Sequence, residues 1–372
     1  MRFPEFTDEW KESVLSDFVE RVKRKNKNNL CKLPLTISAQ YGLVDQISFF
    51  NKVIASENMS NYYLLHKGDF AYNKSYSSEY PWGAIKRLDC YEQGTLSSLY
   101  ICFKPYSHVS SDFLTHYFET SKWHQGISEI AVEGARNHGL LNVGIQDFFE
   151  TRHCLPQSLL EQEKIAKFLN LIEERIATQN KIIEDLKKLK SAISERLFKG
   201  IEGSFVLLSD ICDIVKGKQI NGENLSESGN YYVMNGGTEP SGYYGDYNVD
   251  ANAISISEGG NSCGYVQFNT SPFWSGGHCY SIQNIADNVN NLYLYHYLKS
   301  NEDVIMKLRI GSGLPNIQKK DLAMFKIKVP AIEQQITIST FLSSLERKAE
   351  IEERIQNAML KEKQYLLHQM FI

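Results

Sequence analysis

The segment VLSDFVERVK at residues 14–23 returns as LLSDICDIVK at residues 207–216, and this repetition decides the architecture. Two shorter segments return in the same order further along: FLTHYF (113–118) as YLYHYL (293–298), and GLLN (139–142) as GLPN (313–316). Each match alone is short, but their common order and steadily shrinking offset are hard to obtain by chance. The sequence therefore predicts that one structural unit occurs twice.

A long helical pattern follows each copy, from about residue 159 to 199 and from about 332 to 371. Apolar residues recur at spacings of three, four and seven, which fits one face of a helix or a coiled-coil seam. At 1.5 Å per residue, about 40 residues form a rod of roughly 60 Å. The residues predicted to pair the two helices are Phe168, Ile172, Ile176, Ile183, Leu186, Ile193, Leu197, Phe341, Leu345, Ile355, Met359 and Leu366.

Each apolar stripe needs a covering surface, and we expect the two helices to pair antiparallel as a coiled coil. The alternative is that each helix packs on its own globular domain, although a rod of this length exceeds the width of such a domain. The predicted organisation has a pseudo-twofold internal repeat. Its parts are a first globular domain (1–155), a first spacer helix (156–200), a second globular domain (201–329) and a second spacer helix (330–372).

The fold class predicted for each globular domain is α+β, with a curved sheet and few helices. Residues 253–257 and 98–103 alternate between apolar and polar side chains as strands do. Residues 112 to about 123 read as a helix that Asp112 caps, with residues 291–299 as its counterpart. Glycine and asparagine crowd the second domain, which indicates many exposed turns.

Composition narrows the possible functions. The chain has 372 residues and a formal net charge of −4, and residues 1–155 hold 17 basic and 18 acidic side chains. No region shows the basic excess typical of a domain that binds DNA alone, so a DNA-binding role needs a partner that supplies charge. No run approaches the ~20 apolar residues of a membrane span, and the first residues lack a signal peptide's apolar stretch. We therefore expect a cytoplasmic protein, with seven scattered cysteines in reduced form.

Motifs for catalysis are missing from the sequence. It has no phosphate-binding Gly-x-x-x-x-Gly-Lys-Ser/Thr, no Gly-x-Gly-x-x-Gly, no His-Glu-x-x-His and no Cys-x-x-Cys. None of its nine prolines adjoins another, which excludes the Asn/Asp-Pro-Pro-aromatic loop of an amino-methyltransferase. Glu258 precedes a glycine pair and is interpreted as a turn residue, because no partner group stands near it in sequence. The chain is predicted to bind and not to catalyse.

Two segments could contact nucleic acid. Residues 21–44 carry several basic side chains and no acid, and residues 216–219 are the matching place in the second copy. Either this is a solvated strand end, or it contacts phosphates. Residues 72–87 form a polar loop with aromatic and basic side chains, and its expected equivalent is residues 257–265. Differences between these loops fit either two readers of different bases or ordinary loop drift.

The resulting candidates for DNA binding share a polar or basic side chain in one of these segments or in a nearby loop. They are Lys23, Arg24, Lys25, Lys74, Ser75, Tyr76, Lys86, Arg87, Lys216, Lys218, Gln219, Asn261 and Arg309. No metal ligands are predicted.

The chain resembles the specificity subunit of type I restriction-modification enzymes over essentially its whole length. The paired Leu-Ser-Asp starts carry the resemblance, as do residues 72–75 with 83–87. So do two helix entries in which a proline precedes Glu-Gln and a Phe-Leu pair, at residues 155–169 and 329–342.

The resemblance implies two target-recognition domains that each read half of a bipartite site in double-stranded DNA. The helix pair would set the gap and dock two modification (methyltransferase) subunits, and restriction (motor nuclease) subunits would complete the enzyme. Catalysis, S-adenosylmethionine, ATP and magnesium would belong to those partners, with no cofactor in this chain. A different hypothesis, from the residues alone, is a protein adaptor that holds two protein-binding domains at fixed spacing.

Overall fold

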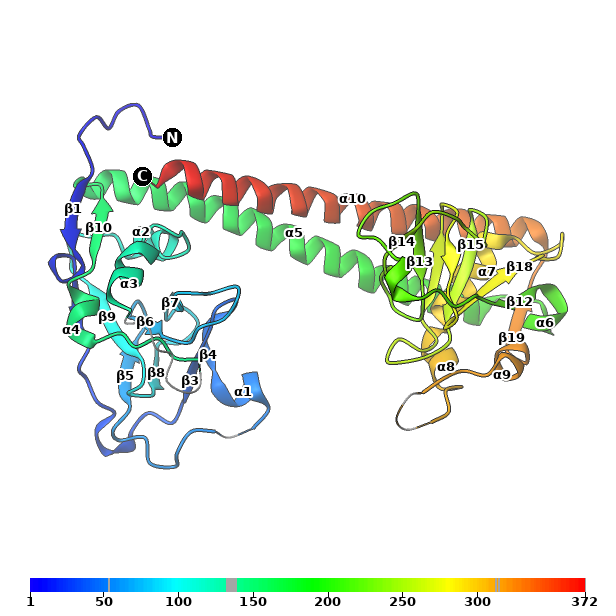
Figure 1. The fold of residues 1–372 in the computed structure, drawn as a ribbon, viewed down its shortest axis with the longest axis horizontal. Coiled ribbons are helices and arrows are strands. Elements are labelled where there is room, and N and C mark those ends of the chain that lie inside the picture. The colour runs from blue at the N-terminus through cyan, green and yellow to red at the C-terminus, as the bar shows by residue number, and fades with distance from the viewer. Residues whose placement is uncertain (53, 132–138, 312, 314, 372) are drawn as a thin grey trace. The chain divides into compact units, whose positions relative to one another are not determined.

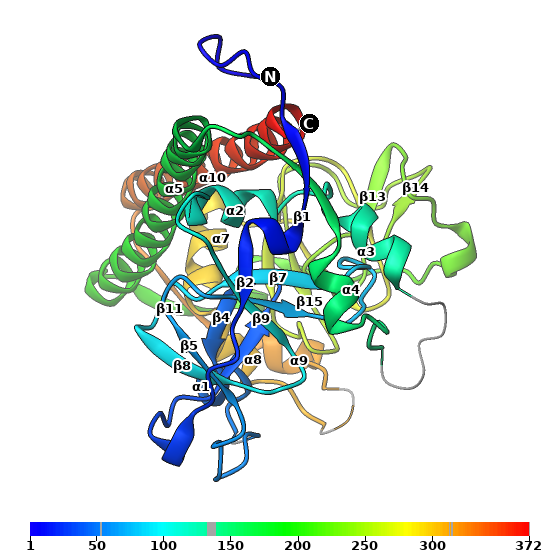
Figure 2. The same ribbon diagram turned by 90° about the vertical axis from the view of Figure 1, so that its left-hand side faces the viewer.

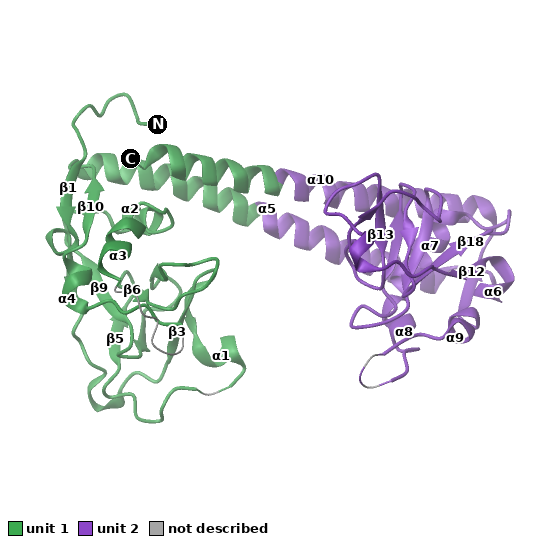
Figure 3. Cartoon of the chain, in the orientation of Figure 1, with its two compact units in different colours: residues 1–178, 356–372 green, residues 179–355 purple. Residues whose placement is uncertain are grey.

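The computed structural model describes every residue except 53, 132–138, 312, 314 and 372. The chain divides into two compact units (Figure 3). Unit 1 comprises residues 1–178 and 356–372, and unit 2 comprises residues 179–355. Each unit thus contains one globular domain with a part of both long helices. The predicted boundaries at 155, 200 and 329 follow the ends of secondary-structure elements, whereas this division follows tertiary packing.

Unit 1 is built on a four-stranded antiparallel sheet in the order β2-β9-β6-β7 (Figure 1). Smaller pairs surround it, and helices and short turns connect them. The strands are β1 (Lys11–Val14), β2 (Val19–Arg21), β3 (Leu35–Ser38), β4 (Gly42–Asp45), β5 (Tyr63–His66), β6 (Phe70–Asn73), β7 (Ala84–Arg87), β8 (Gln93–Leu96), β9 (Ile101–Pro105) and β10 (Arg152–Leu155). The helices are η1 (Leu15–Asp17), η2 (Lys27–Asn29), α1 (Gln46–Phe50), α2 (Ser111–Tyr117), α3 (His124–Ile130), α4 (Ile145–Phe149) and the first part of α5 (Leu159–Gly200).

Unit 2 repeats this sheet in the order β12-β18-β15-β16, again antiparallel throughout. Its other strands pair separately. The strands are β11 (Ser204–Leu207), β12 (Asp213–Lys216), β13 (Tyr231–Met234), β14 (Tyr243–Tyr244), β15 (Ala253–Ser257), β16 (Val266–Asn269), β17 (Trp274–Ser275), β18 (Cys279–Gln283) and β19 (Lys326–Val329). The helices are α6 (Leu208–Ile211), η3 (Gly222–Asn224), α7 (Asn291–Ser300), α8 (Glu302–Met306), α9 (Lys319–Ala323) and α10 (Ile332–Met370), of which α10 ends in unit 1.

The repeated Leu-Ser-Asp motif has the same role in both units. Each domain opens with a strand that pairs with the last strand before the long helix, β1 with β10 and β11 with β19. The leucine that follows, Leu15 or Leu208, is fully buried in the core. The aspartate of the motif then caps the turn, because its carboxylate accepts a hydrogen bond from a backbone N–H three residues earlier. The repetition predicted from sequence is therefore a repetition of structure.

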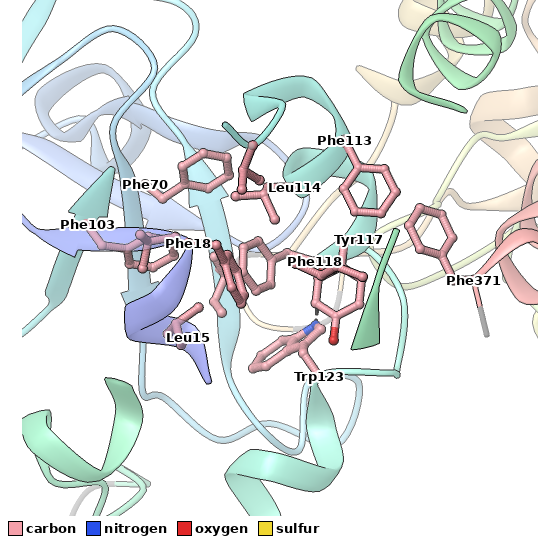
Figure 4. Packing of buried hydrophobic residues seen from close by; sticks show 14 of the residues in the cluster. Leu15, Phe18, Phe70, Phe103, Phe113, Leu114, Tyr117, Phe118, Trp123 and Phe371 are labelled. Atoms are coloured by element: carbon pink, nitrogen blue, oxygen red, sulfur yellow. Dashed lines mark hydrogen bonds between the residues drawn. The ribbon is translucent and has the colours of Figure 1, made fainter. Parts of the chain in front are cut away.

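Aromatic rings fill the core of unit 1 (Figure 4). Phe70 and Phe103 lie on neighbouring strands and stack with ring centroids 5.4 Å apart. Helix α2 adds Phe113 and Tyr117, both buried. The structure differs here from the sequence prediction, since the N-cap of α2 is Ser110 and not Asp112, and a second helix, α3, begins at residue 124. The short serine hydroxyl reaches the Phe113 N–H at 3.2 Å.

The structure also contains the other strands and helices predicted from the sequence, with some differences at their ends. The strand predicted at residues 253–257 is β15, and the helix predicted at 291–299 is α7, which ends one residue later. The strand predicted at 98–103 begins only at Ile101, after a turn. Both long helices are present, with α5 at Leu159–Gly200 and α10 at Ile332–Met370.

A buried glutamine joins α5 to the domain of unit 1. Gln162 donates from Nε2 to the Pro156 carbonyl, and its Oε1 accepts from the backbone N–H of Ser110, both at 2.8 Å. Ser110 is the residue that caps α2. One side chain thus pairs the backbone carbonyl before α5 and the backbone N–H at the start of α2. Burial would otherwise leave these two groups without a hydrogen bond.

Unit 2 uses the same device at the start of α10. Gln335 donates from Nε2 to the Pro330 carbonyl, and its Oε1 accepts from the N–H of Asn290, both at 2.8 Å. Asn290 caps α7, the counterpart of α2. The repeated Glu-Gln of the sequence is therefore a structural joint.

An aromatic ring near the end of the other long helix completes each unit. In unit 1, Phe371 follows α10 and packs on Phe113 and Tyr117 of α2, with centroids 5.3 and 6.0 Å apart (Figure 4). In unit 2, Phe198 near the end of α5 packs on α7 in the same way, at 5.8 Å from Tyr293 and 5.1 Å from Tyr297. Each domain therefore contacts the beginning of one long helix and the end of the other.

The two helices run antiparallel, as predicted. In unit 2, Lys190 pairs with Glu346 and Lys187 pairs with Glu353, both at 2.6 Å, so the residue number falls in one helix as it rises in the other. Unit 1 has the counterpart of the first pair, Glu173 with Lys363 at 2.6 Å. Residues of the two helices correspond at an offset of 173, as Glu173 does with Glu346.

Most of the predicted seam is buried or half-buried, namely Phe168, Ile172, Ile176, Ile183, Leu186, Ile193, Leu197, Leu345, Met359 and Leu366. The structure differs at Phe341 and Ile355, which are 45% and 39% exposed. Leu342, one residue from Phe341, is fully buried against the domain of unit 2 instead. A helix of 3.6 residues per turn drifts from a strict heptad, and the domain at its beginning sets which residue turns inward.

Within the described residues, no helix is long and apolar enough to cross a membrane, and no group of three or more metal-ligating side chains gathers. All seven cysteines are free thiols.

The Phe371 contact predicts a large effect of its removal. Phe371→Ala should lower the free energy of unfolding of unit 1 by about 3–5 kcal/mol, because the ring is 1% exposed and its loss leaves a cavity. The matched control is Tyr365→Ala in α10, the helix that precedes Phe371, where removal of a side chain that is 59% exposed should cost no more than about 0.5 kcal/mol. Urea unfolding measures both variants, and equal midpoints for the two would refute this role.

Buried histidines predict a loss of stability in mild acid. Burial lowers the pKa of His153 and of His296 to about 4, below the ~6.5 of an unfolded histidine. Between these values the unfolded chain binds more protons, so stability is full above pH ~6.5 and falls as the pH drops towards 4. His296→Gln should reduce the slope of unfolding free energy against pH in this window. An unchanged slope would count against the assignment.

Candidate nucleic-acid interface

Two strand ends meet at one edge of the main sheet in each unit. In unit 1, β2 and β6 are both antiparallel to β9, so their C-terminal ends lie at the same edge. In unit 2, β12 and β15 are both antiparallel to β18 with the same result. We call this the loop edge. Lys23 and Lys74 follow the two strand ends in unit 1, and residues 216–219 and 258–261 lie at the corresponding ends in unit 2.

The loop edge of unit 1 is cationic and polar. Lys23 is exposed, Lys74 is half-buried, and neither amino group has a partner among the described residues. Ser75 is exposed and bridges to Leu140 by backbone pairing. The Tyr76 ring is 56% exposed, while its backbone N–H donates to the Gly139 carbonyl at 2.6 Å. This part of the prediction brings four candidate residues to one edge of one sheet.

The loop edge of unit 2 carries an ion pair instead. Lys216 Nζ lies 2.6 Å from Oε1 of Glu258, whose carboxylate is also 3.2 Å from the Tyr280 hydroxyl. His278 Nδ1 lies 3.6 Å from the other carboxylate oxygen. Glu258 is only 7% exposed, and burial together with this carboxylate raises the pKa of Tyr280. No pattern in the sequence indicated these partners, because Lys216, His278 and Tyr280 are distant from Glu258 along the chain.

Backbone pairing shows that Lys74 and Glu258 occupy equivalent positions. The Lys74 carbonyl accepts from the N–H of Leu141, and the Glu258 carbonyl accepts from that of Ile317, both at 2.9 Å. The loops after β6 and β15 therefore correspond, as the sequence indicated. The correspondence of GLLN with GLPN differs by two residues, since Gly139 matches Pro315 in hydrogen bonding and not Gly313. Leu314, part of that motif, lies outside the described residues.

The remaining unit 2 candidates also lie in loops at this edge. Asn261 and Arg309 are exposed. A backbone ladder links their loops, because Asn316 bridges to both Gly259 and Ile310. Lys218 and Gln219 are exposed beyond the end of β12. The Trp274 ring donates to the Lys218 carbonyl at 2.8 Å and fixes this segment.

Arg24 and Lys25 bond within unit 1. Arg24 forms an ion pair with the buried carboxylate of Asp69, and burial raises the pKa of that carboxyl while the arginine opposes the shift. Lys25 donates to the Asn61 carbonyl at 2.9 Å and lies over the Tyr63 ring at 3.7 Å. These contacts anchor the segment after β2 to β5. Their availability for phosphates stays a prediction.

Lys86 and Arg87 lie away from the loop edge. Strand β7 is antiparallel to β6, and Arg87 pairs with Phe70 at the beginning of β6. Lys86 forms an ion pair with Glu119, and Arg87 forms ion pairs with Asp89 and Asp112 at 2.7 and 2.6 Å. The arginine thereby ties β7 to α2. Proximity in sequence to the polar loop did not place these two side chains beside it.

Comparison with known proteins identifies part of the chain directly. Residues 202–361 match the family model described as the type I restriction modification DNA specificity domain. This range runs from just before β11 into α10 and covers the whole globular domain of unit 2.

Proteins assigned as type I specificity subunits are similar in sequence. One from Mycoplasma pneumoniae is 32% identical over 145 residues, and one from Mycoplasma genitalium is 30% identical over 146 residues. Each match spans 38% of this chain and 38% of the relative, so the similarity covers about two fifths of either protein.

Solved structures share the fold over nearly the whole length. The S subunit of a type I restriction-modification system from M. genitalium aligns over 100% of this chain and 99% of its own, with a TM-score of 0.64 and 16% identity. A chain from a study of complex assembly and conformational transition in a type I system aligns over 98% and 97%, with a TM-score of 0.60 and 17% identity. Residues 202–361 thus match a type I restriction modification DNA specificity domain, and the chain as a whole shares the fold of solved S subunits.

Proposed function

We propose that the chain recognises a bipartite site in double-stranded DNA, with each unit reading one half. The observation that carries the proposal is the loop edge. One sheet occurs twice with the same strand order, while the equivalent edge positions hold Lys23 and Lys74 in one unit and Lys216 and Glu258 in the other. A constant framework with different edge side chains suits two readers of different sequences.

The side chains at the two loop edges can bind different groups on DNA. A lysine can donate to the O6 and N7 of guanine or to a phosphate, and a carboxylate can accept from the amino group of cytosine. In unit 2, Lys216 neutralises Glu258, so the edge offers a paired charge with neutral Asn261 and Gln219 beside it. We infer that unit 1 makes the stronger contacts to phosphate, through Lys23 and Lys74.

The net charge of −4 favours action inside a complex, where partners close around the DNA. Exposed apolar side chains occur along both long helices, among them Leu171, Ile182, Leu189, Ile351 and Leu360. Such residues on a helix surface favour docking of other proteins. We propose that the helix pair sets the gap between half-sites and docks two methyltransferase subunits, to which restriction subunits are added.

In this proposal the chain itself has no catalytic role. S-adenosylmethionine, ATP and magnesium bind to the methyltransferase and restriction subunits, and the assembled enzyme acts on DNA in the cytoplasm. No observation favours the protein adaptor as a second candidate.

Exchanging one domain tests the two-reader proposal. Replacement of residues 1–155 by the first domain of another family member should change one half of the methylated motif and leave the other half unaltered. Replacement of residues 201–329 is the reciprocal control and should change the other half. Sequencing of methylated host DNA measures both outcomes. A motif that changes in both halves, or in neither, would mean that the units do not read separately.

The loop edge of unit 1 predicts a specific salt effect. In the complex with methyltransferase subunits, the double variant Lys23→Ala with Lys74→Ala should make the fall of log affinity with log salt less steep. The magnitude of the slope should decrease by about 0.9 for each phosphate that the two lysines neutralise. The matched control is Lys188→Ala with Lys199→Ala, two exposed helix lysines paired with Glu184 and Glu195. Titration of labelled DNA at several salt concentrations gives the slopes. Equal slopes for both double variants would exclude a role of Lys23 and Lys74 in phosphate binding.

A further inference from the structure

Unit 2 has an open groove of about 610 Å³ between the end of α5 and the beginning of α10. Its apolar lining consists of Ile193, Leu197, Ile201 and Ile338. The polar residues that line it are Arg196, Glu333, Gln334 and Thr337. Because the two helices repeat at an offset of 173, the counterpart of this groove in unit 1 can be identified residue by residue.

In unit 1 the chain's own first residues run beside the beginning of α5 and the end of α10 (Figure 1, Figure 2), and they bond to residues at the counterpart positions. Gln369, Glu161 and Lys164 correspond to Arg196, Gln334 and Thr337. The backbone nitrogen of Met1 donates to the Gln369 carbonyl. Arg2 donates to both oxygens of Glu161 at 2.7 and 2.8 Å. Lys164 forms an ion pair with Glu5 and lies 4.6 Å from the ring of Phe3.

The same comparison explains an exposed ring. Phe168, one turn after Lys164, meets Phe3 edge to face at 6.1 Å. Its counterpart Phe341 lies one turn after Thr337 and is 45% exposed, with no ring contact among the described residues. The groove of unit 2 and the Phe341 ring therefore form a continuous surface on α10, because residues four apart share a helix face. We call it the α10 groove.

Two charged side chains at the α10 groove also lack partners. The guanidinium of Arg196 and the carboxylate of Glu333 form no ion pair or hydrogen bond among the described residues. The segment over unit 1 carries a cation, an aromatic ring and an anion within residues 2–5. In unit 1 the cation and the anion bond to Glu161 and Lys164, whose counterparts Gln334 and Thr337 are uncharged. In unit 2 the charged groups available at the groove are instead Glu333 for a cation and Arg196 for an anion.

A second copy of this chain is disfavoured as the source of that occupant. Its residues 1–5 are held on its own unit 1, where Arg2 pairs with a carboxylate that is only 1% exposed, Glu161. Such an intramolecular contact has a high effective concentration and outcompetes binding to another molecule.

We propose that the α10 groove binds an extended segment of a partner protein, in which an aromatic side chain is flanked by a cation and an anion. The segment lies along α10 as residues 1–5 lie along α5 in unit 1. This binding is separate from DNA recognition at the loop edge and does not depend on it.

The test uses a synthetic peptide with the sequence of residues 1–8, labelled at its C-terminus, and the full-length chain. Saturable binding is expected in fluorescence anisotropy, weakened at least tenfold by Phe341→Ala or by Arg196→Glu, both exposed positions that should not disturb folding. Leu189→Ala, an exposed apolar residue of α5 outside the groove, is the control and should leave binding unchanged. A peptide carrying Phe3→Ala should bind at least tenfold more weakly.

Photo-crosslinking then locates the peptide. With a photoreactive phenylalanine at peptide position 3, mass spectrometry should find cross-links near residues 337–341. Cross-links confined to residues 161–168 would mean that the peptide displaces the chain's own first residues, and would overturn the proposal. Absence of saturable binding, or binding equal in the Phe341→Ala and Arg196→Glu variants to that of the unaltered chain, would overturn it as well.

Discussion

One buried glutamine holds each globular domain to the long helix that follows it. The side chains of Gln162 and Gln335 each donate to the carbonyl of a proline. Each also accepts from the N–H of the residue that caps a short helix, α2 in unit 1 and α7 in unit 2. With donor and acceptor both satisfied inside the core, rotation of the helix about its axis would leave two buried polar groups unpaired, at about 1–3 kcal/mol each. The joint therefore fixes which face of the helix meets the domain.

The other end of each long helix completes the opposite domain. Phe371 and Phe198 pack against rings of α2 and α7, so each unit needs a piece of both helices. This interdependence explains why the chain divides near the middle of the helices and not at the ends of the globular domains. A domain exchange must therefore preserve Phe113 and Tyr117, or Tyr293 and Tyr297, as the surface for the incoming ring.

Repeated joints allow the loop edges to diverge. The strand register that places Lys23 and Lys74 at one edge also places Lys216 beside Glu258, although the resulting charge differs completely. Residues that hold the framework, such as Arg24 with Asp69 and Arg87 with Asp112, use their charge internally. The two units also differ at the ends of the long helices. Residues 1–5 bond to this region in unit 1, whereas the equivalent region of unit 2 is an open groove. Similar frameworks thus present different side chains at their surfaces.

The sequence alone determined the internal repeat, both long helices and the helix entry motifs, because these depend on local order and on apolar periodicity. It also indicated the correct pair of loops, since β6 and β15 are followed by equivalent segments. Only the tertiary structure decided that Lys86 and Arg87 lie at the opposite end of the sheet, that Glu258 is an ion-pair partner and not a turn residue, and that Phe341 faces outward. In each of these cases the neighbour comes from a distant part of the chain, and antiparallel pairing or helix rotation sets a side chain's surroundings in a way that its sequence neighbours do not record.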